Sequence, residues 1–209
     1  MTRGGQRFEI HPVTPQVRLV ERAGRVLGDH GVIVIPTDTC YAFVALPGSR
    51  QALDRIAQLK AMNPDKKLFS LIVPDLSDVA TYALVDTHAY RILKRYLPGP
   101  YTFVLPATRE VPRILLAKRK TIGLRVPDNA VCRAVAAAAG GALLATTVRL
   151  PGDDLPLADP DEIEQRVGHA VDLFLDGGWG GVEPSTVVEL AEGGVEVIRE
   201  GSGDPAPFV

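Results

Sequence analysis

The chain has 209 residues, of which 46% are hydrophobic, and carries a formal net charge of −2. This length is typical of one sizeable domain, and the balanced charge excludes a surface that is basic throughout, so any nucleotide or nucleic-acid site must be a local patch. No stretch approaches the ~18 apolar residues of a membrane span, and the N-terminus lacks the apolar core of a signal peptide. We therefore expect a cytoplasmic protein with no membrane partner.

Helix-like and strand-like segments alternate along the chain. Thr14 and Pro15 are typical of a helix start, and the apolar residues after them recur at helical spacing as far as Gly31. Further helices are predicted at 50–59, 87–96, 130–139 and from Asp159 to Gly168, with a short helical segment at 111–117. Apolar runs predict strands at 32–35, 68–73, 102–105, 122–126, 143–146, 171–175, 186–190 and 195–199. This alternation predicts an α/β fold with helices packed on a sheet.

The segment Ile35-Pro36-Thr37-Asp38-Thr39-Cys40-Tyr41 places polar side chains directly behind a predicted buried strand. Pro36 cannot extend a central strand, and the side-chain oxygens that follow it compete with regular backbone pairing. Ligands of open α/β sheets bind outside the carboxyl ends of strands, so the segment suits a small polar substrate. An ordinary turn explains the same residues without a ligand, and on this segment alone the turn is the favoured interpretation.

Five further motifs follow in order: Pro98 to Thr102, Thr121 to Pro127, Ala145 to Thr147, Pro184 to Val188, and Ile198 to Gly201. In this order and spacing the chain resembles the YrdC/YciO family, whose best-known members are threonylcarbamoyl-AMP synthases of tRNA modification. The resemblance covers about 8–209 and is closest to the YciO branch, on the segments 118–123, 149–152 and 200–204. It implies a single YrdC-like domain over 1–209, with a twisted mixed sheet, flanking helices and a concave basic groove.

The resemblance implies an L-threonylcarbamoyladenylate synthase-like nucleotidyltransferase. L-threonine, bicarbonate and ATP, the last with Mg²⁺, would give threonylcarbamoyl-AMP and pyrophosphate for the N6-threonylcarbamoyladenosine modification of tRNA. Such a site must hold a polyanion and orient a zwitterion, so positioning and charge neutralisation carry most of the work. The sequence shows no carboxylate set for a protein-bound metal, and Cys40 and Cys132 form no metal-spaced cluster, so we predict reduced thiols and no metal site.

The family-matched positions divide by task. The Arg125 guanidinium suits the carboxylate of the amino acid because it can pair with both oxygens. The resemblance assigns threonine binding to Thr39, Arg125, Ala145 and Ser185. It assigns nucleotide binding to Lys60, Lys66, Thr121, Thr147 and Arg199, and catalysis to Lys60, Thr147 and Arg149.

Each assignment has a structural alternative. A solvated loop explains the lysines from Lys60 to Lys67, and an exposed strand end explains Arg199. Arg125 lies in an apolar strand, where a buried arginine must be paired, so a structural ion pair and a function both explain it and we favour function. Cys40 is rejected as a nucleophile, because the sequence places no histidine as its base.

Two positions depart from the family pattern. Active synthases have Lys-x-Arg where this chain reads Lys60-Ala61-Met62, and Ser-x-Asn where it reads Thr147-Val148-Arg149. Loss of a charged contact to phosphate weakens a site roughly ten- to a hundredfold, so we expect weak activity unless Arg149 supplies the missing charge. Two other classes stay open: a protein that binds double-stranded RNA or tRNA through the run 118–120, and a nucleotide-binding module with an eroded catalytic site.

Overall fold

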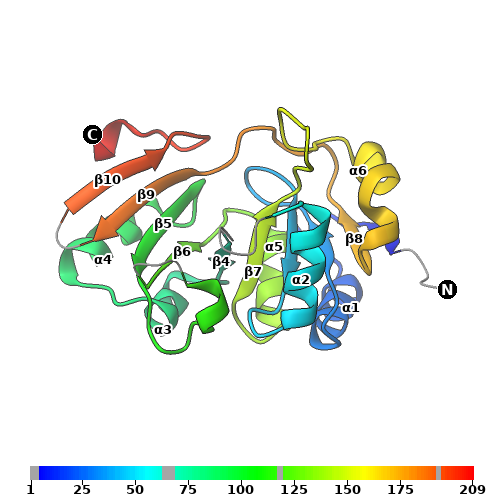
Figure 1. The fold of residues 1–209 in the computed structure, drawn as a ribbon, viewed down its shortest axis with the longest axis horizontal. Helices are drawn as coiled ribbons and strands as arrows, with labels where there is room; N and C mark the ends of the chain where they lie inside the picture. The colour runs from blue at the N-terminus through cyan, green and yellow to red at the C-terminus, as the bar shows by residue number, and fades with distance from the viewer. Residues whose placement is uncertain (1–4, 63–68, 117–119, 192–193) are drawn as a thin grey trace.

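The computed structural model describes residues 5–62, 69–116, 120–191 and 194–209 (Figure 1). The described strands form one sheet in the order β1-β8-β2-β3-β7-β4-β6-β5-β9-β10. The strands are β1 (Gln6–Glu9), β2 (Ile33–Ile35), β3 (Ala42–Ala45), β4 (Ser70–Ile72), β5 (Tyr101–Pro106), β6 (Thr121–Arg125), β7 (Leu143–Thr147), β8 (Leu173–Asp176), β9 (Thr186–Ala191) and β10 (Gly194–Arg199). The helices are α1 (Val17–Gly28), α2 (Arg50–Leu59), α3 (Val79–Tyr82), α4 (Thr87–Tyr96), α5 (Ala130–Ala138) and α6 (Pro160–Val167).

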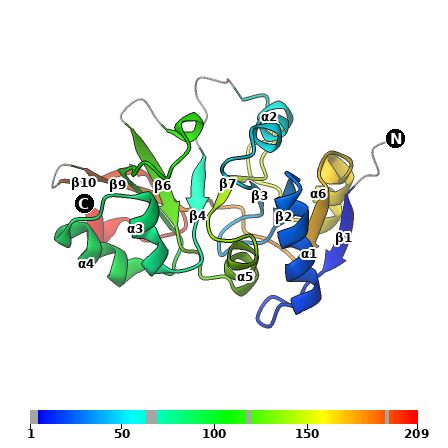
Figure 2. The same ribbon diagram turned by 90° about the horizontal axis from the view of Figure 1, so that it is seen from below.

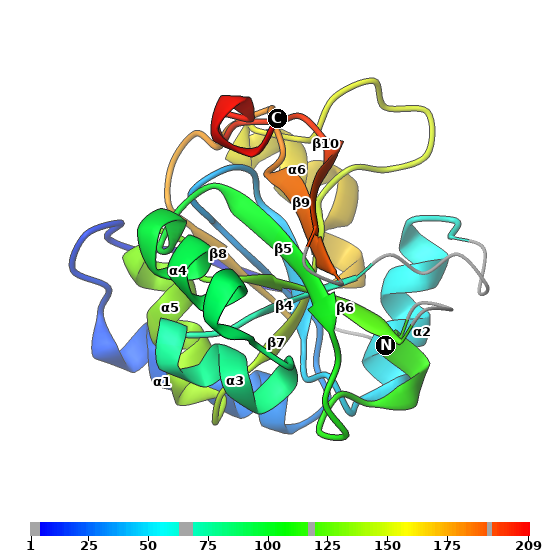
Figure 3. The same ribbon diagram turned by 90° about the vertical axis from the view of Figure 1, so that its left-hand side faces the viewer.

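The sheet is mixed, as predicted. β8 pairs in parallel with β1 and β2, and the pairs β4 with β6 and β5 with β9 are also parallel. The other neighbours, from β2 with β3 to β9 with β10, run antiparallel. Figure 3 shows β9 and β10 beside β5, and β10 is the last strand at that edge of the sheet. The predicted α/β fold of a mixed sheet with flanking helices is therefore confirmed.

Buried apolar side chains form two clusters. One joins α1 and α5, which lie side by side (Figure 2), to β2, β3, β7 and β8. The two helices approach so closely that a Cβ on Gly24 would come within 2.8 Å of the carbonyl oxygen of Ala138, so a glycine is required there. The second cluster holds residues of α2, α3, α4 and α6 around Phe43 and Phe103. Among the described residues, no helix is both long enough and apolar enough to cross a membrane.

Most elements lie where the sequence places them, but several differ, among them the short helix α3, which was not predicted. Helix α1 begins at Val17 and not after Thr14, because the backbone N–H of Thr14 instead donates to His11 Nδ1 in a turn. The strand β3 was not predicted, although its sequence AFVA is an apolar run like those that predict other strands. The edge strand β1 was missed as well, because its sequence QRFE carries a single large apolar side chain. The helical segment predicted at 111–117 contains a turn of 3-10 helix, Arg113–Leu115, in its described part. Position 117 of that segment, and position 68 of the strand predicted at 68–73, lie outside the described residues.

Tyr41 connects β3 to the glycine-rich loop 177–181. Its buried hydroxyl donates to the carbonyl of Gly178 at 2.5 Å and accepts from the N–H of Gly177 at 3.0 Å. Tyr41→Phe leaves both backbone groups without this partner, so the free energy of unfolding should fall by about 1–3 kcal/mol, as measured by urea unfolding. The control is Tyr90→Phe on α4, where the side chain is exposed and the change should stay within about 0.5 kcal/mol. Equal effects of the two substitutions would contradict the anchoring role of Tyr41.

Candidate functional site

A cavity of about 590 Å³ lies against β5, β6 and β9 and extends to β3, β4, β7 and β10. Side chains along a strand alternate between the two faces of a sheet, and this alternation builds the lining. On β5, Thr102 and Val104 line the cavity, whereas Phe103 between them is fully buried in the core. The same alternation places Gly123 and Arg125 of β6, and Val187 and Glu189 of β9, in the lining.

Arg125 is the central cationic group of this cavity and is only 7% exposed. Its Nη2 donates to Asp38 Oδ1 at 2.7 Å and to Thr39 Oγ1 at 3.1 Å, while its Nε has no hydrogen-bond partner. A buried donor without a partner costs about 1–3 kcal/mol, and a ligand oxygen that accepted from Nε would remove that cost. Burial raises the pKa of Asp38 above its ordinary value, although the Arg125 charge and the N–H of Asp128 act in the opposite direction.

A β-bulge brings a second guanidinium to the cavity. Val197 pairs with Val188, but Arg199 pairs with Val187, so Ile198 is an extra residue in β10. In a regular strand without this bulge, the side chain of Arg199 would lie on the opposite face from Val187. Instead Arg199 lines the cavity and its Nη2 donates to the carbonyl of Ser185 at 2.7 Å. Burial and the charge of Arg125 both lower the pKa of Arg199, so the two cations are close enough to repel each other.

Four other predicted site residues share this cavity: Thr121, Ala145, Thr147 and Ser185. Ser185 is 3% exposed, and its hydroxyl is 2.7 Å from that of Thr102 in a buried hydrogen bond. The structure thus brings together hydroxyl groups and guanidinium groups from segments that are far apart in the sequence. The lining carries both signs of charge, because Glu189 faces the same space. A basic groove that extends beyond the cavity stays a prediction.

Lys60 and Arg149 are predicted site residues that do not line this cavity. The Lys60 amine donates to the carbonyl oxygens of Thr147 and Arg149 at 2.5 and 3.0 Å. The Arg149 side chain is exposed, and its Nε donates to the carbonyl of Asp153 at 3.0 Å. Met62, where the resemblance leads us to expect an arginine, packs against the larger core cluster. Lys66, and the positions 118 and 119 of the basic run, lie outside the described residues.

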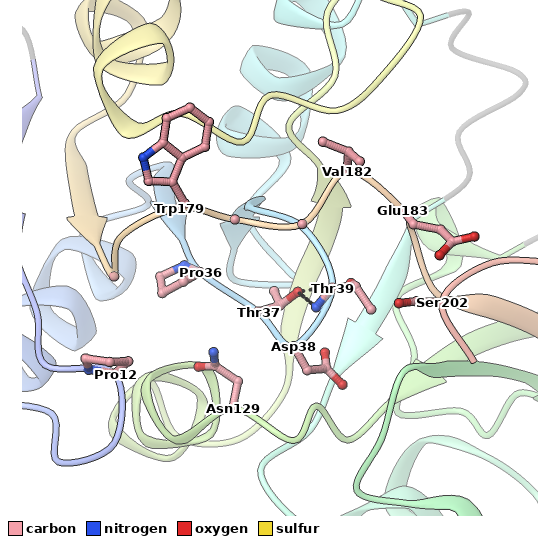
Figure 4. A pocket seen from close by; sticks show the side chains of 13 residues that line it. Pro12, Pro36, Thr37, Asp38, Thr39, Asn129, Trp179, Val182, Glu183 and Ser202 are labelled. Carbon is pink, nitrogen blue, oxygen red and sulfur yellow. Dashed lines mark hydrogen bonds between the residues drawn. The ribbon is translucent and has the colours of Figure 1, made fainter. Parts of the chain in front are cut away.

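Thr39 lines a second cavity of about 430 Å³, shown in Figure 4. Trp179, which is 78% exposed, lies on one side of the view, and Asp38 and Asn129 lie on the other. A Cβ on Gly181 would come within 2.0 Å of the Thr39 carbonyl oxygen, so the glycine-rich loop lies directly on the backbone of Thr39. Asp38 lines this second cavity and Arg125 lines the first, so their ion pair separates the two.

Both cysteines are free thiols, as predicted, and both are buried. Cys40 lines the larger cavity, where burial raises the pKa of its thiol to about 11, in spite of the nearby charges of Arg125 and Arg199. The thiol is therefore protonated at neutral pH, which is unfavourable for a nucleophile. In the part of the chain that the structure describes, no group of three or more His, Cys, Asp or Glu side chains is placed to hold a metal ion.

Sequence reasoning gave no role to three residues that belong to the site. Asp38 and Thr102 lie within quoted motifs, but the contacts of Asp38 with Arg125 and of Thr102 with Ser185 are between distant segments. Glu189 lies in a predicted strand two residues after Val187, and strand alternation places both on one face. Alternation alone therefore offered a signal for Glu189, but it left open which face holds the cavity.

Comparison with known proteins shows the family. A model of the Sua5, YciO and YrdC proteins, described as "Telomere recombination", matches residues 25–201. The chain is 44% identical to YciO of Escherichia coli strain K12, which is named as an uncharacterized protein, over 98% of this chain and 99% of that one. A crystal structure of E. coli YciO matches with a TM-score of 0.93 at 43% identity and covers 98% of this chain and 100% of that one. The chain therefore belongs to the Sua5/YciO/YrdC family.

Relatives with a named activity or ligand are more distant. A threonylcarbamoyl-AMP synthase of Chromobacterium violaceum is 35% identical over 68% of this chain and 73% of its own length. P. abyssi Sua5, whose crystal structure is complexed with L-threonine, has a TM-score of 0.86 at 21% identity, covering 94% of this chain and 57% of that one. At this level of identity the likeness to Sua5 concerns the fold alone.

The amine of Lys60 provides a test of the loop contacts beside the cavity. Burial, the largest cause, and the charge of Arg149 lower its pKa to about 8, so the folded protein loses this proton more readily than the unfolded chain. The contribution of Lys60 to the free energy of unfolding should therefore rise as the pH rises from about 8 towards 10.5, the ordinary pKa of a lysine. Over that range the free energy of unfolding of the wild type should gain on the order of 2–3 kcal/mol relative to Lys60→Met. Parallel pH profiles of the two proteins would show that the amine is solvated.

The ion pair of Asp38 with Arg125 can be tested by removing one charge. Asp38→Asn leaves the guanidinium buried without a counter-charge, so the free energy of unfolding should fall by roughly 3–5 kcal/mol in urea. Glu162→Gln is the matched control, because Glu162 forms an exposed pair with Arg166 at 3.1 Å and such pairs contribute less than about 1 kcal/mol. A loss as small as that of the control would mean that water reaches Arg125.

Proposed function

We propose that this protein is a threonylcarbamoyl-AMP synthase-like nucleotidyltransferase with slow turnover. The observation that carries the proposal is the pair of guanidinium groups, Arg125 and Arg199, in one cavity, with the Nε of Arg125 unpartnered. The 35% identical relative that is named as a synthase, and the L-threonine in the Sua5 structure, support the same chemistry.

The reaction joins three substrates. The amine of L-threonine and bicarbonate form a carbamate and release water. A carbamate oxygen then attacks the α-phosphorus of ATP, and the bond to pyrophosphate breaks, which leaves threonylcarbamoyl-AMP. Magnesium would enter as the complex with ATP, and its ligands would be phosphate oxygens and water. The protein must hold the carbamate oxygen in line with the phosphorus, so the work of its residues is positioning and charge neutralisation.

The residues of the cavity divide this work. Arg125 would bind the carboxylate of threonine through the donors that Asp38 and Thr39 leave available. The hydroxyls of Thr102 and Ser185 line the same cavity. Arg199 would neutralise phosphate charge, with Thr121 and Thr147 as hydroxyl donors in the same lining. Slow turnover is expected because Met62 packs on the core and Arg149 is directed to Asp153, so neither supplies a charge to the described cavity.

The second candidate is a nucleotide-binding module that retains the cavity without turnover. The same placement of Met62 and Arg149 favours it, because both departures from the family pattern affect charge and not cavity shape. RNA binding through the run 118–120 stays a prediction, since two of its residues lie outside the described part of the chain.

Pyrophosphate release distinguishes the two candidates. With ATP and magnesium, release should require both L-threonine and bicarbonate, and omission of either should abolish it. Arg199→Gln should weaken ATP affinity roughly ten- to a hundredfold, because a charged hydrogen bond to phosphate is lost, whereas Arg91→Gln on the exposed face of α4 should change nothing. ATP binding without any threonine-dependent release would favour the binding module. Absence of ATP binding at millimolar concentration would remove both candidates.

A further inference from the structure

Glu189 is a cavity residue that the proposed chemistry does not use. Of the described residues that line the larger cavity, it alone is acidic. It is half-buried, and it forms no hydrogen bond or ion pair with any other described residue. A partly desolvated carboxylate that faces a cavity without a donor is unfavourable, and a ligand that carries an N–H group would relieve this.

The neighbours of Glu189 increase this cost. Glu196 of β10 lies directly opposite Glu189 in the antiparallel register, and like charges in that position destabilise a strand pair. On the other side, Val104 of β5 is its register partner, and Val187 precedes it on the same face. The carboxylate is therefore bordered by a like charge on one side and by apolar side chains on the other.

Its distance from the cationic groups indicates which part of a ligand it meets. Arg199 contacts Ser185, and Glu189 follows four residues later along the chain, which corresponds to about 13 Å in an extended strand. Between these two positions the lining is mainly apolar, from Val104, Val187 and Ile198. The cavity therefore has an anion-binding end, an apolar middle and a distant hydrogen-bond acceptor.

We propose that Glu189 determines the base specificity of this cavity by accepting a hydrogen bond from the exocyclic amine of adenine. This inference rests on the proposed function, since it places the phosphate of the nucleotide at Arg199. The ribose is joined directly to the phosphate, so its hydroxyls stay near the arginines. The exocyclic amine lies at the far end of the flat base, where Glu189 is placed. Hypoxanthine has a carbonyl oxygen in the place of that amine, and two acceptors facing each other repel.

The test is calorimetric binding of AMP and of IMP, its hypoxanthine counterpart, to the full chain. The wild type should bind AMP at least about tenfold more tightly than IMP, because IMP leaves the carboxylate unpaired against a carbonyl. Glu189→Gln should bring this ratio close to one, since the amide of glutamine can donate to the carbonyl of IMP. Glu196→Gln is the matched control: it removes the neighbouring carboxylate, which is exposed and outside the lining, and should leave the ratio at the wild-type value.

The outcomes separate this inference from the function on which it rests. If both nucleotides bind but the ratio of AMP to IMP affinity is the same in Glu189→Gln as in the wild type, Glu189 does not determine base specificity. Nucleotide binding itself is then still supported. A wild-type ratio near one overturns the inference without any variant, so the test does not depend on the folding of Glu189→Gln. If the wild type binds neither nucleotide, the proposed function fails together with the inference.

Discussion

The buried ion pair between Arg125 and Asp38 is the constraint on which the rest of the site depends. Arg125 lies on β6, between β4 and β5, and a guanidinium in that position must have a counter-charge. Asp38 supplies it from the loop after β2, which is separated from β6 by three strands in the sheet. The loop must therefore reach across the sheet, and its backbone has to be held in place by other parts of the chain.

That support comes from the segment between β8 and β9. Tyr41 holds Gly177 and Gly178 through its hydroxyl, and Gly181 lies on the carbonyl of Thr39, where any side chain would collide with the backbone. Thr39 in turn accepts from Arg125. Close approach thus requires a glycine at 181, whereas the left-handed φ of +89° favours a glycine at 178. Two loops that are far apart in the sequence act together to fix one guanidinium between the two cavities.

The sequence predicts local structure well and the charges of the site poorly. Helices α2 and α4 match their predicted bounds, and each has a capping side chain at its start: Ser49 and Asp86 accept from the N–H of the third residue beyond. By contrast, strand β3 carries no periodic signal, and the bulge at Ile198 that turns Arg199 to the cavity follows from pairing with β9 alone. The partner of Arg125 could not be read from the chain either, since Asp38 is 87 residues away. The family resemblance indicated the candidate site residues, but only the fold shows which of them are in contact.

On the proposed function, the placement of charge would account for slow turnover. In the described lining the cationic groups are Arg125 and Arg199, and Asp38 already neutralises part of the first. The amine of Lys60 already donates to two carbonyls, which leaves one of its three N–H donors for a phosphate. On the proposed function, the two guanidinium groups would match the single phosphate of an adenylate better than ATP, because the triphosphate carries more negative charge. On the proposed function, the described residues would supply the amino-acid end of the site, whereas Met62 and Arg149 would leave the pyrophosphate leaving group without a stabilising charge.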